Sequence, residues 1–158
     1  TYPLLEGWNL IHFPFRPDSF STASELVKAV AQSGGYVTTV ATWQDGRWRE
    51  YIQRGADVYS ADLPINPGAA YFLRSHRQFD WSVTGTLVTP PPLKLNPGWN
   101  TIGLFPETDL TAANILETLK AKELDRWLSG LWEPFVFDTL TYGYNFPISD
   151  QQGYMIKL

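Results

Sequence analysis

The chain has 158 residues, which allow one ordinary domain or two small ones. A formal net charge of −4 without any run of Lys or Arg argues against nucleic acid and anionic membrane as partners. Without cysteine there is neither a disulfide framework nor a thiolate metal site, and no apolar stretch approaches the ~20 residues of a membrane-spanning helix. Aromatic residues make up 15% of the chain, so we expect them to dominate the core and any recognition surface.

The first elements predicted are a strand and a short helix. Residues 4–5 and 8–13 form an apolar, branched run between Pro3 and Pro14 and predict an opening strand. Ser21 or Thr22 then offers an N-cap oxygen, with Glu25 as a capping-box partner. Apolar side chains on one helical face follow, and the glycines at 34–35 end the segment, so we expect an amphipathic helix of about three turns.

A hairpin and further strands come next. Branched and aromatic residues at 36–43 and 47–52 predict two strands joined at Asp45-Gly46, which is a strong hairpin signal because glycine accepts positive φ. A turn then leads to a predicted strand at 69–73, and residues 79–88 predict one more.

The second half of the chain repeats the landmarks of the first half in the same order. The paired landmarks are residues 7–9 (Gly-Trp-Asn) with 98–100, 22–30 with 111–119, Trp43 and Trp48 with Trp127 and Trp132, and Tyr71 with Tyr154. A chance match would not preserve this order, so we interpret the chain as two degenerate tandem repeats. The predicted fold class is α+β, mainly β, with antiparallel strands, a Trp hairpin and one short helix in each repeat.

The expected organisation is a first repeat at 1–88, a proline-rich connection at 89–97 and a second, shorter repeat at 98–158 that lacks the last strand. Because the chain starts with Thr1, we expect it to be a processed or excised piece of a larger secreted protein. Whether the two repeats share one core is left open by the sequence.

Aromatic residues of the two hairpins form the candidate ligand site, which consists of Trp43, Trp48, Tyr51, Trp127 and Trp132. One interpretation is an exposed platform on which sugar rings stack, with hydrogen bonds from Gln44, Arg47 and Arg49 at its edge. The other is that these rings fill the core beneath the helix. Trp8 and Trp99 are expected to anchor their repeats, and Trp81 has no counterpart.

Signals for catalysis or metal binding are weak. The only histidines, His12 and His76, lie in different parts of one repeat, and His12 is expected to be a structural or a surface histidine. No cofactor is implied, and no metal-ligand spacing occurs, although a calcium site built from scattered oxygens stays open. A small polysaccharide hydrolase with a carboxylate pair is the alternative function, with Asp45, Glu50, Asp62 and Glu133 as its candidate residues.

The marks at residues 7–9, 98–100, 70–72 and 153–155 resemble the tandem modules that start with Gly-Trp-Asn and close near Gly-Tyr-Trp. These modules occur in secreted and cell-surface proteins of bacteria and archaea. The resemblance implies a secreted or surface location, modularity and attachment to other domains of a parent protein. Together with the weak signals for catalysis and the aromatic hairpins, it leads us to expect a non-catalytic, structural, adhesive or carbohydrate-binding module whose partner is a polysaccharide or a surface protein.

Overall fold

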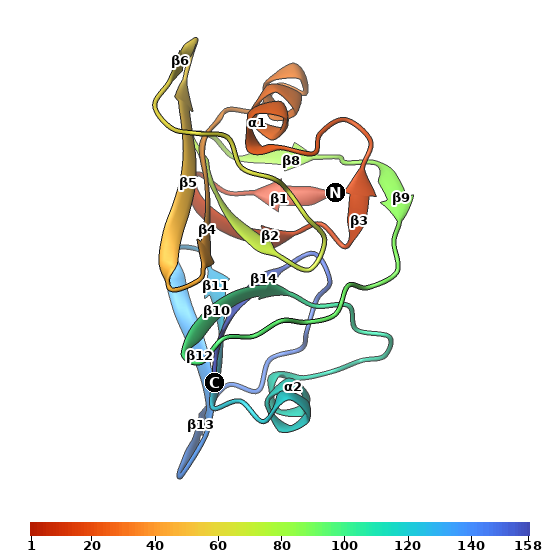
Figure 1. Ribbon diagram of the computed structural model, residues 1–158, viewed down its shortest axis with the longest axis vertical. Helices are drawn as coiled ribbons and strands as arrows, with labels where there is room; N and C mark the ends of the chain where they lie inside the picture. The colour runs from red at the N-terminus through yellow and green to blue at the C-terminus, as the bar shows by residue number, and fades with distance from the viewer.

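The computed structural model describes residues 1–158 and contains two lobes, one from each repeat, stacked along the long axis of the molecule (Figure 1). Each lobe consists of an antiparallel five-stranded sheet and one α-helix. Strands dominate and both helices are short, which confirms the predicted α+β, mainly β fold class. Neither helix has the length and hydrophobicity needed to cross a membrane.

The two sheets have the same strand order. In the first lobe the neighbouring strands are, in spatial order, β2 (Gly7–His12), β7 (Ala70–Ser75), β4 (Val37–Gln44), β5 (Arg47–Arg54) and β6 (Asp57–Val58). In the second lobe they are β10 (Trp99–Gly103), β14 (Gly153–Lys157), β11 (Glu123–Leu128), β12 (Leu131–Phe137) and β13 (Thr141–Gly143). The order matches strand for strand, so the repeat seen in the sequence is a repeat of topology.

Each helix begins directly after a threonine N-cap, which in the first repeat is Thr22 rather than the other candidate, Ser21. In α1 (Ala23–Gln32) the Thr22 side chain accepts a hydrogen bond from the Glu25 amide, while the Glu25 carboxylate accepts one from the Ser21 amide. This differs from a standard capping box, in which the carboxylate would reach the N-cap residue itself. In α2 (Ala112–Leu119) the cap is Thr111, and an asparagine side chain takes the place of the carboxylate.

Two-residue turns close both Trp hairpins. Asp45 and Gly46 have φ values of 52° and 75°, and Ser129 and Gly130 have values of 48° and 87°. Positive φ at both central residues defines the type I′ turn, whose twist matches that of the flanking strands. Trp43 therefore pairs with Trp48 across the first hairpin, as Trp127 pairs with Trp132 across the second.

Two predicted strands are each divided in the structure. The opening run forms β1 (Tyr2–Leu4) and β2, because Gly7 has a φ of 100° and turns the chain between them. The run at 79–88 forms β8 (Phe79–Trp81), which pairs with β1, and β9 (Gly85–Leu87), which pairs with β3 (Phe15–Pro17). Both lie outside the main sheet, and the second repeat has no counterpart to them.

Three apolar clusters hold the molecule together. The largest lies between α1 and its sheet and includes the buried Trp81, which stacks on Phe20. A second cluster lies between α2 and its sheet. The third consists of Leu10, Ala41, Ala70 and Phe72, with Trp8 and Trp127 packed against it from different repeats. Each repeat thus has a core of its own, and an additional cluster joins the lobes.

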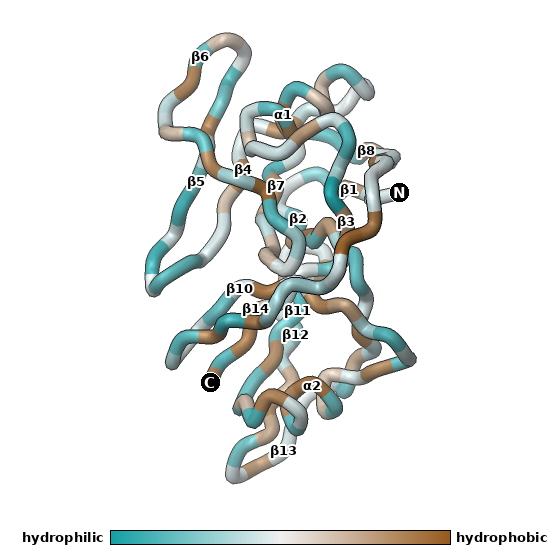
Figure 2. The backbone as a smooth tube through the Cα atoms, turned by 45° about the vertical axis from the view of Figure 1, so that its right-hand side comes forward, coloured by the Kyte–Doolittle hydropathy of each residue, from teal (hydrophilic) through white to brown (hydrophobic).

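The two Trp hairpins extend toward each other near the middle of the molecule (Figure 1). They differ in polarity, because β5 is largely hydrophilic whereas β12 contains more hydrophobic residues (Figure 2). The helices cover one face of each sheet, which leaves the opposite faces to form the contact between lobes.

Candidate functional site

The repeated Gly-Trp-Asn sequence shapes the entry to each sheet. In the first repeat Asn9 is buried, its side-chain oxygen accepts a hydrogen bond from the Leu5 amide (2.8 Å), and its amide donates to the Leu5 carbonyl (2.9 Å). In the second repeat Asn100 makes the same two hydrogen bonds with Asn96. The asparagine therefore fixes the turn before the strand, which is a structural role.

Equivalent hydrogen bonds run in both directions between the lobes. The indole Nε1 of Trp127 donates to the carbonyl of Trp8 (2.8 Å), and Nε1 of Trp43 donates to the carbonyl of Trp99 (3.1 Å). Because Trp43 and Trp127 occupy the same place in the two repeats, as do Trp8 and Trp99, the lobes are related by an approximate twofold axis. The carbonyl of each opening tryptophan thus accepts a hydrogen bond from the Trp hairpin of the other repeat.

His12 departs from this symmetry. The His12 side chain is fully buried, and its Nε2 accepts a hydrogen bond from the Gly68 amide (2.8 Å). The neutral ring therefore carries its proton on Nδ1, which donates to the Asp150 carbonyl (2.6 Å). Burial lowers the pKa of His12 to about 4, against the opposing effect of Asp150. The equivalent residue in the second repeat is Gly103, where an added Cβ would lie 2.0 Å from the His12 ring. Of the two expected roles, structural and surface, the buried His12 has the structural one, and it links the two lobes.

An open hollow of about 350 Å³ lies where the two Trp hairpins meet the first sheet. Its lining comes from β2, β4, β5 and β7 of the first repeat and from the β11–β12 hairpin of the second. The lining residues are Trp8, Ala41, Trp48, Glu50, Phe72, Trp127 and Trp132. Neither repeat alone could form it.

The five aromatic rings of this hollow, which we call the aromatic box, are those of Trp8, Trp48, Phe72, Trp127 and Trp132. Phe72 is almost fully buried and lies at the centre of the group. Its ring centroid lies 5.7 to 6.1 Å from those of the four tryptophans, and the interplanar angles are 90° to Trp8, 87° to Trp127 and Trp132, and 60° to Trp48. The tryptophans thus stand steeply to the Phe72 ring and do not form a flat platform.

Three of the five predicted ligand residues belong to the aromatic box. Trp48 and Trp132 are about half exposed, at 50% and 41%, and Trp127 is partly buried. Trp43 packs edge-on against Trp48 and makes the interlobe hydrogen bond, but does not line the hollow. Tyr51 lies on the opposite face of the sheet in the core beneath α1, so it has no access to the hollow.

Trp8, Phe72, Ala41 and Glu50 complete the lining but were not in the sequence-based ligand set. Sequence reasoning had assigned Trp8 to the scaffold and had listed Glu50 only among carboxylates for hydrolysis. Strand parity carried one further signal, because Glu50 lies two residues beyond Trp48 and therefore on the same sheet face. Phe72 gave no comparable signal, because its position in the hollow depends on how the lobes pack.

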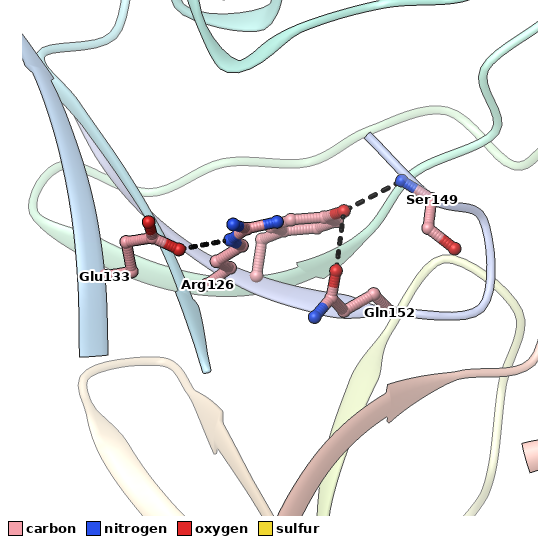
Figure 3. A network of polar contacts seen from close by, with 5 residues as sticks. Arg126, Glu133, Ser149 and Gln152 are labelled. Atoms are coloured by element: carbon pink, nitrogen blue, oxygen red, sulfur yellow. Dashed lines mark hydrogen bonds and ion pairs between the residues drawn. The ribbon is translucent and has the colours of Figure 1, made fainter. Parts of the chain in front are cut away.

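The four candidate carboxylates have different surroundings. Asp45 is exposed in the hairpin turn, with an Arg49 nitrogen 3.9 Å away. Glu133 pairs with Arg126 on the helix-facing side of the second sheet (Figure 3). Asp62 caps the start of α1: burial raises its pKa, but hydrogen bonds from Ser24 outweigh this and lower it overall.

Glu50 is the fourth carboxylate and the only charged residue that lines the hollow. Glu50 and Asp62 also border a separate depression of about 370 Å³ beside Trp48. Asp62 is held there by its hydrogen bonds to the helix, and its lowered pKa favours the ionised form, which is unsuited to proton donation.

Near Glu133, a hydrogen-bond network fixes the last loop of the second repeat. Figure 3 shows Arg126 and Glu133 together with Ser149 and Gln152. The Tyr154 hydroxyl accepts a hydrogen bond from the Ser149 amide (2.8 Å) and contacts the Gln152 side chain (3.3 Å). Tyr71 accepts an equivalent bond from an amide in the first repeat, so this polar group is part of the shared framework.

No group of three His, Asp or Glu side chains is placed as a metal site would require. No known family model, no curated protein and no solved structure matches this chain.

Proposed function

We propose that the protein is a non-catalytic binding module of a larger secreted or cell-surface protein, with the aromatic box as its ligand site. The proposed partner is a polysaccharide or another surface component. The observation that carries the proposal is the gathering of exposed tryptophans from both repeats at one hollow. Aromatic rings bury large areas with little loss of side-chain freedom, and for this reason they dominate many recognition sites.

Exposure of Trp48 and Trp132 supports a binding role over a purely structural one. A tryptophan that served only to fill the core would be buried, as Trp81 is. Both rings instead remain about half exposed although they contact the buried Phe72. Exposed aromatic side chains gathered across two lobes are typical of an interaction site.

Retention on immobilised polysaccharides and on a glycan array tests this proposal. We expect the wild-type protein to be retained, and Trp48→Ala or Trp132→Ala to reduce retention at least about tenfold, since truncation of such anchor residues costs about 2 kcal/mol or more. Tyr59→Ala is the matched control, because Tyr59 is 63% exposed and does not line the hollow. Absence of retention, together with tryptophan variants that lose only stability, would reduce the aromatic box to a structural feature.

A further inference from the structure

We infer that the group held by the aromatic box is a small, fully alkylated ammonium, such as the trimethylammonium group of choline. This inference rests on the proposed function and names the chemistry of its ligand. Cations are attracted to the faces of aromatic rings, and tryptophan gives the strongest attraction. Several rings arranged around one space can therefore replace the hydration of a cation that has no hydrogen-bond donors.

The shape of the site favours a compact cation over a flat sugar ring. A stacked sugar needs an open, flat aromatic face, whereas the tryptophans here stand at 60° to 90° to the Phe72 ring. The four lining tryptophans come from both lobes, so they lie on more than one side of the hollow. The hollow of about 350 Å³ is open to solvent, so the remainder of a larger ligand can extend outward.

The charge of the lining points the same way. Glu50 is the only charged side chain among the seven lining residues, and it lies on the same sheet face as Trp48. Outside the lining, the Arg74 guanidinium lies over the Trp8 ring, 5.8 Å from its centroid, so this ring of the box already contacts a cation. The Glu50 carboxylate complements a positive charge and disfavours an anion. A primary ammonium would need acceptors for three N–H groups, and Glu50 is the only carboxylate in the lining, whereas a fully alkylated ammonium needs none.

The site is present on one side of the approximate twofold axis only. The second-repeat positions equivalent to Ala41, Glu50 and Phe72 are occupied by Asp125, Pro134 and Met155. The tryptophans, by contrast, are the same in both repeats. The Phe72 ring and the Glu50 carboxylate are therefore specific to the first-repeat side of the hollow.

The test compares choline with 3,3-dimethylbutan-1-ol, its neutral carbon analogue, by tryptophan fluorescence and calorimetry at constant ionic strength. We expect choline and tetramethylammonium to bind saturably, and the neutral analogue to bind about tenfold more weakly, as expected for a cation–π contribution of about 1 to 2 kcal/mol. Ethanolamine, the primary-ammonium counterpart of choline, should bind more weakly than choline.

Two variants test separately whether choline binding depends on the Glu50 charge and on the tryptophan rings. Glu50→Gln should weaken choline several-fold and leave the neutral analogue unchanged, whereas Trp132→Ala should weaken both. Glu117→Gln, an exposed carboxylate of α2, is the matched control and should change neither. Far-UV circular dichroism and thermal unfolding of each variant separate lost binding from lost folding.

Each outcome bears on the inference and separately on the proposed function. Equal binding of choline and its neutral analogue, or no effect of Glu50→Gln, would overturn the cationic ligand. Polysaccharide retention that depends on Trp48 and Trp132 would still support the binding module in that case. No binding of choline overturns the inference; no retention on any polysaccharide as well would also remove the proposed function.

Discussion

The two repeats share a framework but differ on the sheet faces that meet between the lobes. Gly-Trp-Asn, the Trp hairpin and the closing tyrosine occur in both and make equivalent contacts. At the interlobe face, the first repeat has Ala41, Glu50 and Phe72, whereas the second has Asp125, Pro134 and Met155 at the equivalent positions. The shared residues thus build the fold and supply the four tryptophans of the hollow, and the residues that differ, Ala41, Glu50 and Phe72, complete its lining on one side only.

A second difference lies at the axis itself. His12 of the first repeat faces Gly103 of the second, where a symmetric pair of histidines would have no room. A close contact on a twofold axis often requires one large and one small residue. The two repeats therefore function as complementary partners, although they began as similar sequences.

The largest effect is expected for Gly103→Ala. Its Cβ would lie 2.0 to 2.5 Å from atoms of the His12 ring, so the strand or the ring must move. We expect a loss of about 3 kcal/mol or more in the free energy of unfolding, measured by urea denaturation. In the double variant His12→Ala/Gly103→Ala, we expect a loss of unfolding free energy smaller than the sum of the losses in the two single variants, because the smaller side chain leaves room for the new Cβ. A loss equal to that sum would contradict the contact between His12 and Gly103.

Stability should depend on pH in opposite ways through His12 and Asp125. For His12, the folded pKa of about 4 lies below the unfolded value of 6.5, so its contribution to stability is present above pH 6.5 and is lost as pH falls to 4. The pKa difference sets the full loss at up to about 3 kcal/mol.

For Asp125, burial and then the charge of Glu123 raise the pKa from 3.8 to about 7, so stability falls as pH rises from about 4 to 7.

Two variants separate these contributions in urea denaturation from pH 4 to pH 7.5. Asp125→Asn should be more stable than the wild type at pH 7, with a gain that disappears toward pH 4, because one carboxylate oxygen is buried without a partner. His12→Gln should be less stable at pH 7, with a smaller loss at pH 4. Differences from the wild type that do not vary with pH would refute both assignments.

Asn9→Ala and Asn100→Ala should have similar costs. Each asparagine is buried and satisfies a backbone amide and carbonyl in the turn before its strand. Loss of these bonds should destabilise the protein by about 2 kcal/mol in each case. A cost confined to one repeat would show that the shared sequence no longer has a shared role.

Smaller, matched effects are expected for Trp43→Phe and Trp127→Phe. Each change keeps an aromatic ring but removes the indole donor to a carbonyl of the other lobe. We expect about 1 to 2 kcal/mol for each, and values within about 0.5 kcal/mol of each other. Thermal unfolding of the pair therefore tests the approximate twofold relation directly.

Much of the fold could be predicted from local sequence. Thr22 and Asp45-Gly46 have the chemistry of a helix cap and a type I′ turn, and the structure has both features at these positions. The division of the opening strand was not predicted, because apolar residues lie on both sides of Glu6 and Gly7 and were assigned to one strand. Local patterns identify elements, whereas breaks in a strand depend on which partner each segment finds.

The site was only partly predictable, because it forms between repeats that are distant in sequence. Trp48 and Trp132 could be chosen from their recurrence, but recurrence also selected Trp43, which does not line the hollow. Tyr51 was selected for proximity in sequence and lies in the core. Phe72 acquires its role through contact with Trp127 and Trp132 of the other repeat, which periodicity within one repeat does not reveal.

The most direct test of a single ligand site between unlike repeats is a ¹⁵N NMR titration of the seven tryptophan indoles with tetramethylammonium chloride. We predict saturable shifts for Trp8, Trp48, Trp127 and Trp132, with one common dissociation constant. Trp81, buried beneath α1, and Trp99, the second-repeat counterpart of Trp8, should remain unchanged. Equal shifts of Trp8 and Trp99, or no saturable shift of any indole, would contradict a ligand site formed at the first-repeat floor.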